Sequence, residues 1–427
     1  MSRIVVIGAG AMGLAAAHRA AQLGHEVDLI EADSVAGGMA AHFDFGGLSI
    51  ERFYHFVCKS DEPTFALMRE LGIGDKMRWR PTSMGYFMKG RVHPWGDPIS
   101  LLRFPHLSLI AKIRTGLQMF LTTKTGNFAS IERKTARQWL EGGSGKEVYN
   151  TLWKRLMDLK FYELADDISA SWIATRVRRI GNSRRSIFQE ELGYIEGGSQ
   201  TLVDAMVSAY TDKGGRLHLS TPAEKVETAN GRVTGVTAGG RFFPADAVIS
   251  TIPTPLISRL VPDLPANTKA KYDAIRNIGV VCLLFKLKKS ISRNFWVNIV
   301  DENIEIPGLI EFSNLRPIDD TIVYVPYYMP VTLPKWQWSD QQFIDEAFGY
   351  IRRVNPKITQ TDLVDAKVGR LKYAQPVCEP NFMAKLPPIQ TPIGGLQIAD
   401  TCYYYPEDRG IAESVRYGRY MAEGVVR

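Results

Sequence analysis

The sequence predicts an α/β fold in two parts, one built around a parallel sheet and the other a mixed α+β domain. Three observations lead to this fold class. A glycine-rich turn joins an apolar strand to an Ala-rich helix at the N-terminus, strand and turn signals return within 193–260 and 386–427, and helical or aromatic-rich stretches separate these segments. With 427 residues, 45% of them hydrophobic, the chain can form a large core shared by two or three domain-sized units.

The N-terminal turn has the spacing of a phosphate-binding loop. An apolar run at 3–7 predicts a buried parallel strand, and a helix is expected from 11 to 23. Between them, Gly8 permits a tight turn, Gly10 leaves room for a pyrophosphate, and Gly13 lets the helix pack close to the sheet. The first helical amides, those of Ala11 and Met12, would stabilise phosphate charge together with the helix dipole.

A second strand, at 26–30, ends in an acidic residue, Glu31, which is followed by Ala32. A carboxylate at this point accepts hydrogen bonds from a ribose diol and repels a 2′-phosphate, so NADP is disfavoured. The order of strand, glycines, helix, strand and acid predicts a Rossmann-like dinucleotide-binding unit. The alternative is a glycine turn that binds no ligand.

A second glycine pair distinguishes FAD from NAD. Gly37 and Gly38 follow Glu31 closely and precede Met39. Here the sequence resembles the flavin amine oxidase superfamily, which includes protoporphyrinogen oxidases, phytoene-type desaturases and monoamine oxidases. The resemblance implies that the pair passes beside the pyrophosphate of FAD, and that Met39 stands where many members have a phosphate-contacting arginine.

Two segments in the middle of the chain extend the resemblance. Residues 193–202 open a helix that leads back to the cofactor domain and to Val226, whose backbone would meet the adenine. A hairpin with Asn230–Gly231 at its turn then leads to 245–253, the strand and turn that the family places near the flavin and that contain Thr251.

The C-terminal segment completes the match. A strand ends in Asp400, which the resemblance places at the ribityl or phosphate region of FAD. Gly410 and Ile411 begin a helix whose N-terminus would point at the flavin ring. The positive end of a helix dipole stabilises the negative charge of reduced flavin near N1 and O2.

These segments imply a glutathione-reductase-type FAD-binding domain that is discontinuous in sequence. It is expected to comprise 1–75, 193–260 and 386–427, and the substrate-binding domain 76–192 and 261–385. The first substrate block reads helical, with an apolar stripe over 147–164. The sequence holds no second glycine fingerprint, so no NAD(P)H site is expected.

Three side chains are candidates for a catalytic role. His55 lies in a stretch that runs beside the flavin ring in related proteins, with a structural histidine as the alternative. Glu311 is an acid in an apolar setting, where burial would raise its pKa. Tyr404 lies where amine oxidases place an aromatic cage. The lysine that amine oxidases place near flavin N5 has no evident counterpart.

The function expected from these features is FAD-dependent oxidation, in which hydride leaves a largely apolar substrate of the isoprenoid, tetrapyrrole or amine class. Dense aromatic residues in the second substrate block suit such a ligand, and oxygen or a quinone would reoxidise the flavin. One alternative is a non-redox flavoenzyme resembling UDP-galactopyranose mutase, acting on a sugar nucleotide. A further alternative is a non-catalytic FAD protein that serves as a scaffold.

Composition bears on location and partners. Four dispersed cysteines and an N-terminus that runs straight into the first strand indicate a reduced, cytoplasmic protein. The net charge of +7 comes without a nucleic-acid recognition motif or metal-ligand spacing, so neither partner is expected. Residues 99–120 mix apolar and basic side chains and could contact a membrane peripherally, at its inner face, although a helix that caps the substrate domain is the alternative.

Overall fold

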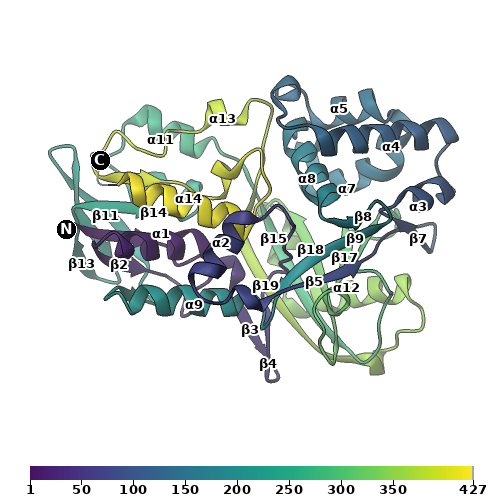
Figure 1. The fold of residues 1–427 in the computed structure, drawn as a ribbon, viewed down its shortest axis with the longest axis horizontal. Coiled ribbons are helices and arrows are strands. Elements are labelled where there is room, and N and C mark those ends of the chain that lie inside the picture. The colour runs from purple at the N-terminus through teal and green to yellow at the C-terminus, as the bar shows by residue number, and fades with distance from the viewer. Residues whose placement is uncertain (426–427) are drawn as a thin grey trace.

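Five parallel strands form the sheet that carries the glycine loop. The computed structural model of the protein describes residues 1–425. The strand order is β10-β2-β1-β14-β20, and the strands span Arg216–His218 (β10), Glu26–Ile30 (β2), Arg3–Ile7 (β1), Ala247–Ser250 (β14) and Leu396–Ile398 (β20). These strands come from three distant parts of the chain, so the sheet is discontinuous in sequence as expected (Figure 1).

Helix α1 packs between two other helices on one side of this sheet. These helices span Ala11–Gln22 (α1), Ser199–Thr211 (α9) and Ile411–Gly424 (α14), and α2, Glu62–Glu70, packs on α14. A three-stranded antiparallel sheet contacts β1 and β14, with strands Ala223–Ala229 (β11), Arg232–Ala238 (β12) and Arg241–Pro244 (β13). Its turn at Asn230–Gly231 has φ angles of 51° and 74°, as the Asn-Gly pair predicts.

A second, seven-stranded sheet forms the centre of the other half of the molecule. Its order is β19-β15-β18-β17-β16-β6-β7, with strands Leu363–Pro376 (β19), Asn277–Leu287 (β15), Thr321–Met329 (β18), Gly308–Glu311 (β17), Trp296–Ile299 (β16), Met84–Met88 (β6) and Arg91–Trp95 (β7). Side chains alternate across it. Tyr324 and Tyr328 join the core of the parallel sheet, whereas Val323 and Tyr327 belong to a separate core with helix α12, Asp340–Val354.

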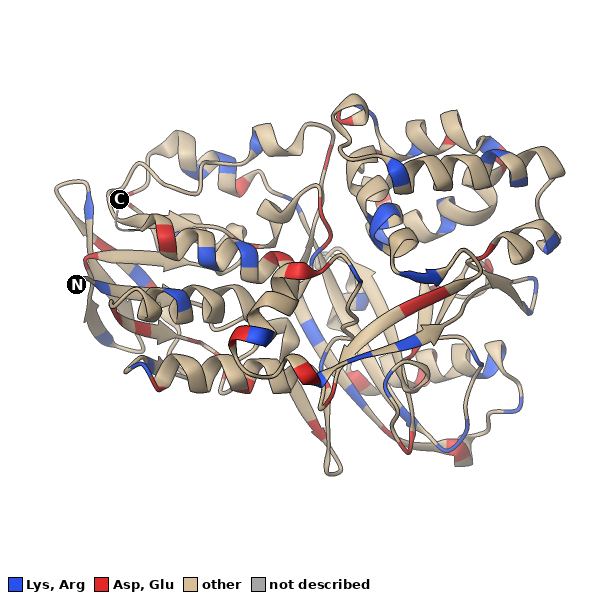
Figure 2. Cartoon of the chain, in the orientation of Figure 1, with Lys and Arg blue, Asp and Glu red and all other residues tan. Residues whose placement is uncertain are grey.

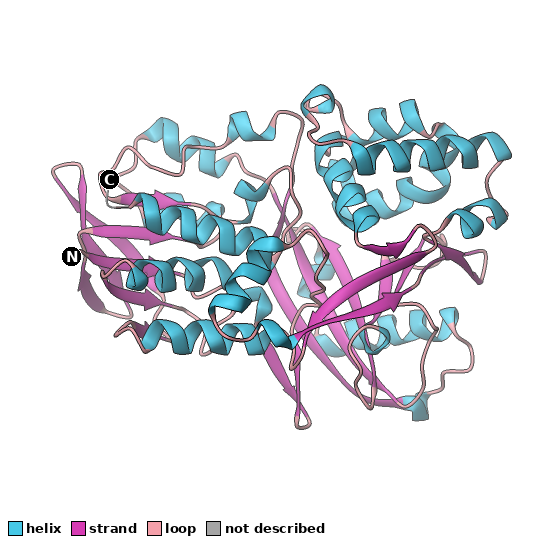
Figure 3. Ribbon diagram, in the orientation of Figure 1, coloured by secondary structure: helices cyan, strands magenta, loops and turns pink. Residues whose placement is uncertain are grey.

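A layer of helices lies beyond one end of the second sheet (Figure 3). Its members are Pro98–Arg103 (α3), Leu109–Lys124 (α4), Ala136–Gly143 (α5), Lys146–Val148 (α6), Lys154–Phe161 (α7) and Ala170–Asn182 (α8). A small sheet of Met77–Thr82 (β5), Gln189–Ile195 (β9) and Arg184–Ser186 (β8) lies beside it. The remaining short elements are β3 (His42–Phe45), β4 (Leu48–Glu51), α10 (Ile257–Leu260), α11 (Ala266–Asp273) and α13 (Phe382–Lys385).

The helical reading of the first substrate block was incomplete. Strands β5 to β8 lie within it and β9 begins in it. β5 and β6 pair with strands distant in sequence, β9 and β16, which local patterns do not reveal, and β7 and β8 extend these pairs as hairpins. The helix over 147–164 is also interrupted, by a π-helical turn at Tyr149–Trp153. This turn inserts one residue into the helix and shifts the apolar stripe, so Met157 is buried whereas Leu156 is only partly buried.

Candidate functional site

The glycine loop between β1 and α1 is fixed from the end of β14. Gly8 has a φ of 97°, which favours glycine. The Thr251 amide and hydroxyl both donate to the carbonyl of Ile7, at 2.9 Å. Thr251 therefore supports the glycine loop through hydrogen bonds to the backbone of Ile7. The strand pattern in the sequence does not predict this contact.

The two other glycines of the loop have different steric roles. A Cβ on Gly13 would lie 1.8 Å from the Gly8 carbonyl oxygen, so α1 can approach the strand only with glycine there. A Cβ on Gly10 would meet no atom nearer than the Gly38 Cα, at 4.0 Å. The space beside the Gly10 backbone, at the positive end of α1, is therefore free of protein atoms and fits a phosphate group.

Glu31 organises the loop as well as presenting a carboxylate. Its two oxygens accept hydrogen bonds from the amides of Ala9, at 2.7 Å, and Asp33, at 2.8 Å. A carboxylate has about four lone-pair sites, so capacity remains for a ribose diol. Ala32 beside it is exposed.

The second glycine pair lies against the first loop; its place beside the pyrophosphate of FAD stays a prediction. The Gly37 amide donates to the Ala9 carbonyl at 2.8 Å, and a Cβ on Gly38 would lie 3.1 Å from the Gly10 Cα. Met39 is partly exposed on this turn. Arg52, which no sequence motif singled out, donates from its guanidinium to Asp33 at 2.6 Å and so brings a cation to the same edge.

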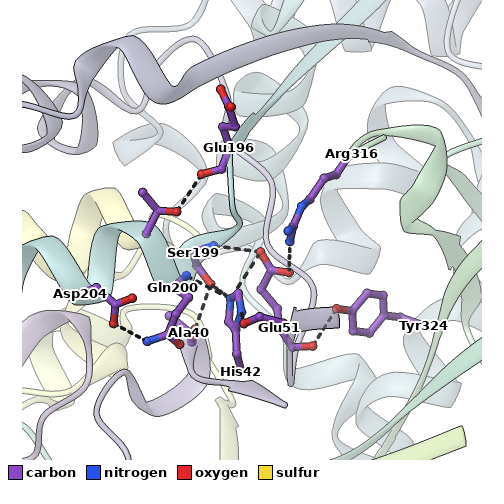
Figure 4. A network of polar contacts seen from close by, with 11 residues as sticks. Ala40, His42, Glu51, Glu196, Ser199, Gln200, Asp204, Arg316 and Tyr324 are labelled. Atoms are coloured by element: carbon purple, nitrogen blue, oxygen red, sulfur yellow. Dashed lines mark hydrogen bonds and ion pairs between the residues drawn. The ribbon is translucent and has the colours of Figure 1, made fainter. Parts of the chain in front are cut away.

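A buried polar network holds this turn in place (Figure 4). The Ser199 hydroxyl, at the start of α9, donates to the Ala40 carbonyl at 2.9 Å, and the Ser199 amide donates to the Glu51 carboxylate at 2.9 Å. Arg316 pairs with Glu51 at 3.4 Å. The Gln200 amide donates to His42 Nε2 at 3.0 Å, so this nitrogen is an acceptor and the imidazole is neutral.

The buried His42 predicts an acid-sensitive fold. Burial, with Arg316 and His55 adding to it, lowers the pKa of His42 from 6.5 to about 3. Below about pH 6.5 the unfolded chain binds a proton that the folded chain rejects, so this group removes about 1.4 kcal/mol of stability per pH unit down to about pH 3. Burial raises the pKa of Glu51, which acts in the opposite direction. Urea unfolding at pH 7 and pH 5 should therefore show a smaller acid loss for His42→Asn than for the parent chain, and equal losses would contradict this account.

Helix α14 runs parallel to α1 and extends beyond its start. Gly418 packs against Met12, and Arg19 pairs with Glu423 at 2.8 Å. The α14 N-terminus at Ile411 therefore lies roughly 6 Å beyond that of α1 along the helix direction. The role that the resemblance gives the α14 N-terminus toward the flavin ring stays a prediction.

Asp400 and Val226 are both buried at the edges of this site. The Asp400 carboxylate accepts hydrogen bonds from the amides of Thr254, at 2.6 Å, and Cys402, at 2.9 Å, and burial raises its pKa. Val226 pairs with Val236 in the small antiparallel sheet. The roles that the resemblance assigns to these residues toward FAD stay predictions.

His55 retains a free nitrogen in a largely apolar setting. Its Nδ1 is buried without a hydrogen-bond partner among the described residues. Burial, with Arg409 adding to it, lowers the pKa of His55 to about 4, although a backbone hydrogen bond at Phe53 acts in the opposite direction. At neutral pH His55 is therefore an uncharged imidazole, close to the segment that precedes α14.

An aromatic wall stands next to His55. The ring of Tyr54 makes edge contacts with Trp296, at 5.3 Å between centroids, and with Tyr324, at 5.7 Å. Trp296 lies on β16 and Tyr324 on β18, two strands of the seven-stranded sheet that are separated by β17. Segment 52–56 thus lies between the parallel-sheet core and the face of the second sheet that carries tyrosines.

The structure does not bring the other two catalytic candidates to this wall. Glu311 pairs with Val323 and points to the opposite face of the sheet, and its oxygens accept bonds from Ser290, Ile291 and Ser292. Burial raises the pKa of Glu311 to about 7, as expected. Its hydrogen bonds, however, hold the loop at 290–292, which is on the face of the sheet away from the aromatic wall. The Tyr404 hydroxyl forms a hydrogen bond with the Ser414 hydroxyl on α14, at 2.8 Å.

This architecture defines a dinucleotide-binding protein in which a discontinuous Rossmann-like domain meets a mixed second sheet at an aromatic wall. The chain belongs to the family of flavin containing amine oxidoreductases, whose model matches residues 13–399. Its cofactor is FAD, and it is an FAD-dependent oxidoreductase.

Relatives of known name cover the whole chain. A 15-cis-phytoene desaturase from Arabidopsis thaliana is 23% identical over 100% of this chain and 80% of its own length. Among solved structures, a protein from Exiguobacterium sp. 255-15, provisionally assigned as a protoporphyrinogen oxidase, has a TM-score of 0.76 at 16% identity, covering 99% of this chain and 98% of its own. A putrescine oxidase variant has a TM-score of 0.73 at 17% identity, covering 100% and 99%. The family match gives the mutase-like alternative no support.

Proposed function

We propose that the protein takes hydride from a C–H or C–N bond of a largely apolar substrate of the isoprenoid, tetrapyrrole or amine class. The observation that carries this proposal is the placement of His55 and the aromatic wall beside the loop that leads into α14. Arg409, directly before that helix, is close enough to lower the pKa of His55. Related proteins named as desaturases and oxidases agree with this class of reaction.

The residues of the chain divide the work in this proposal. Gly10 and the first amides of α1 bind the pyrophosphate, Glu31 binds the ribose, and the α14 N-terminus stabilises negative charge on the reduced cofactor. Bound FAD supplies the hydride-accepting ring. The aromatic wall orients a flat apolar substrate and excludes water, and His55, uncharged at neutral pH, can accept a proton at Nδ1.

The visible spectrum of the purified protein tests the proposal. Flavin bands near about 375 and 450 nm that dithionite bleaches are expected from a bound redox-active flavin. Recovery within seconds of re-aeration would identify oxygen as the acceptor, whereas slow recovery with rapid oxidation by a quinone would identify a quinone. A protein without bands after incubation with FAD would contradict the proposal.

We also propose that the substrate is collected at a membrane surface through helices α3 and α4. Six large apolar side chains on one side of α4 are more than half exposed, namely Leu109, Ile110, Ile113, Leu117, Phe120 and Leu121. Ile99 and Leu102 on α3 are 48% and 58% exposed, and Ile187 and Phe188 lie on the turn after β8. Such a patch is unusual for a surface that faces only water.

The charge of this segment suits an anionic bilayer. Residues 98–124 contain no acidic side chain, so α3 and α4 carry no red in Figure 2. Arg103, Arg114 and Lys124 are exposed. Basic residues beside an apolar helix face are typical of helices that lie in the headgroup region. No helix of residues 1–425 is long and apolar enough to cross a bilayer, so the contact proposed is a peripheral one.

Removing three apolar side chains from α4 should abolish vesicle binding. The triple variant Ile110→Ser, Ile113→Ser, Leu117→Ser is expected to bind phosphatidylglycerol vesicles at least about 100-fold more weakly, because each lost side chain contributes roughly 1.5–3 kcal/mol of burial. Flotation of the FAD-loaded protein measures this. Phe242→Ser, which removes an exposed apolar side chain from β13, is the control. Equal flotation of all three proteins would show that α4 is not the contact.

A further inference from the structure

Three cationic side chains converge behind the aromatic wall. Lys160 on α7 lies over the rings of Tyr328, at 4.6 Å, and Trp172, at 5.2 Å. The Arg176 guanidinium on α8 stacks on the same Trp172 ring at 3.6 Å. Arg409 lies near enough to lower the pKa values of both Lys160 and Arg176. Residues from two helices and from the start of α14 thus meet at one place.

The charges of this group are not balanced by the chain. Among residues 1–425, one carboxylate, that of Asp408, forms an ion pair within it, with Arg176. The buried Nε atoms of Arg176 and Arg409 have no hydrogen-bond partner among the described residues. Burial, reinforced by the neighbouring arginines, lowers the pKa of Lys160 well below its ordinary range. Holding Lys160 in its charged form beside two arginines and one carboxylate, in a poorly hydrated place, is costly unless another anion joins them.

The backbone on both sides of Lys160 is irregular. A π-helical turn at Tyr149–Trp153 precedes α7, and Tyr162, a non-glycine residue, has a φ of 54° at its end. Both features cost free energy and are found disproportionately at functional sites. The π-turn also shifts the helix face by one residue, which places Lys160 between the buried Met157 and Phe161 and against Tyr328 of the second sheet.

We propose that Lys160, Arg176 and Arg409 bind an acidic group of the substrate, a carboxylate or a phosphate, while its flat apolar body lies along the aromatic wall. This inference rests on the proposed function and narrows its substrate class. A cationic amine would be repelled by this group, and an uncharged hydrocarbon would supply no counter-ion for Lys160, which forms no ion pair among the described residues. The favoured substrate is therefore an apolar, conjugated or aromatic acid.

Two structural relations favour a substrate anion over the cofactor as the partner. Lys160 and Arg176 come from the helical layer, not from the Rossmann-like domain, and the rings that frame them, Trp172 and Tyr328, belong to α8 and the second sheet. Tyr328 in turn neighbours Tyr54, where it helps to raise the pKa of the Tyr54 phenol. The cations are therefore continuous with the aromatic wall.

Binding of benzoate to the FAD-loaded protein tests the proposal, with uncharged benzamide as the matched ligand. Titration calorimetry should show saturable benzoate binding and at least about tenfold weaker benzamide binding, because only the carboxylate forms charge-assisted hydrogen bonds. Lys160→Met, which removes the charge and keeps the length of the side chain, should weaken benzoate at least about tenfold. Lys160→Arg should restore it, and Lys271→Met on the exposed face of α11 should leave it unchanged.

The outcomes separate this proposal from the proposed function. Equal binding of benzoate and benzamide, or unchanged benzoate affinity in Lys160→Met, would overturn the anion subsite while the flavin spectrum remained normal. A shifted flavin midpoint potential in Lys160→Met with unchanged benzoate affinity would assign the cations to the cofactor and likewise overturn it. Absence of flavin from the parent chain would instead contradict the proposed function, and that is measured before any titration.

Discussion

Gly10→Val is expected to give a folded protein that binds no FAD. The Gly10 Cβ position faces open space, since the nearest protein atom lies 4.0 Å away, so valine should not disturb the loop. The same space is where a pyrophosphate must approach the backbone amides of α1. The yellow colour should disappear while the circular dichroism spectrum stays that of the parent chain.

The control for this prediction is a valine at another open glycine. Gly126→Val, in the loop after α4, also meets no atom within 4 Å and should retain stoichiometric FAD. FAD retained by Gly10→Val would show that the pyrophosphate does not pass this loop. An unfolded Gly10→Val protein would show that the space beside the Gly10 Cβ position is not open.

Gly418→Ala is expected to destabilise the fold by several kcal/mol. A Cβ at this position of α14 would lie 2.2 Å from the Met12 carbonyl oxygen and 3.0 Å from the Ala15 Cβ and the Ala16 amide nitrogen. Backbone atoms of α1 cannot move aside as a flexible side chain can, so the two helices must separate and lose packing along their whole contact. Because α14 then shifts, FAD affinity should fall as well.

The same substitution in another helix provides the matched control. Gly349 lies in α12, where an added Cβ meets no atom within 4 Å, so Gly349→Ala should stabilise by up to about 1 kcal/mol through helix propensity. Urea unfolding of both variants and the parent chain, with and without FAD, measures these changes. If Gly418→Ala is as stable as the parent chain, then α1 and α14 do not approach each other as the structure shows.

Both predictions concern close backbone approaches, and the sequence reveals only some of these. The loop glycines can be recognised in the sequence by their spacing, because the strand, the turn and the helix are consecutive in the chain. Gly418 does not, because the carbonyl it meets is 406 residues away and no local pattern distinguishes it from the open Gly349.

For the catalytic candidates too, the sequence indicated some properties, whereas others depended on the packing of distant segments. The apolar context of Glu311 correctly suggested burial and a raised pKa, but alternation in β17 directs it to the sheet face away from the aromatic wall. Lys160 was overlooked because it reads as one more solvated cation on a helix. Its position against Tyr328 depends on the π-turn and on a strand that lies more than 160 residues later.

The sequence by itself determined the βαβ unit that begins the parallel sheet, and the phosphate loop with its acid and second glycine pair, because these features depend on neighbours in the chain. The FAD-binding class followed from these features and from the resemblance of the later segments. Only the tertiary structure decided which charged groups meet. Helix offset, strand alternation and a one-residue π-insertion are set by packing between distant segments, and they bring Lys160, Arg176 and Arg409 together while turning Glu311 away. Charged side chains interact strongly only within roughly 10 Å, so which of them interact follows from that packing and not from residue order.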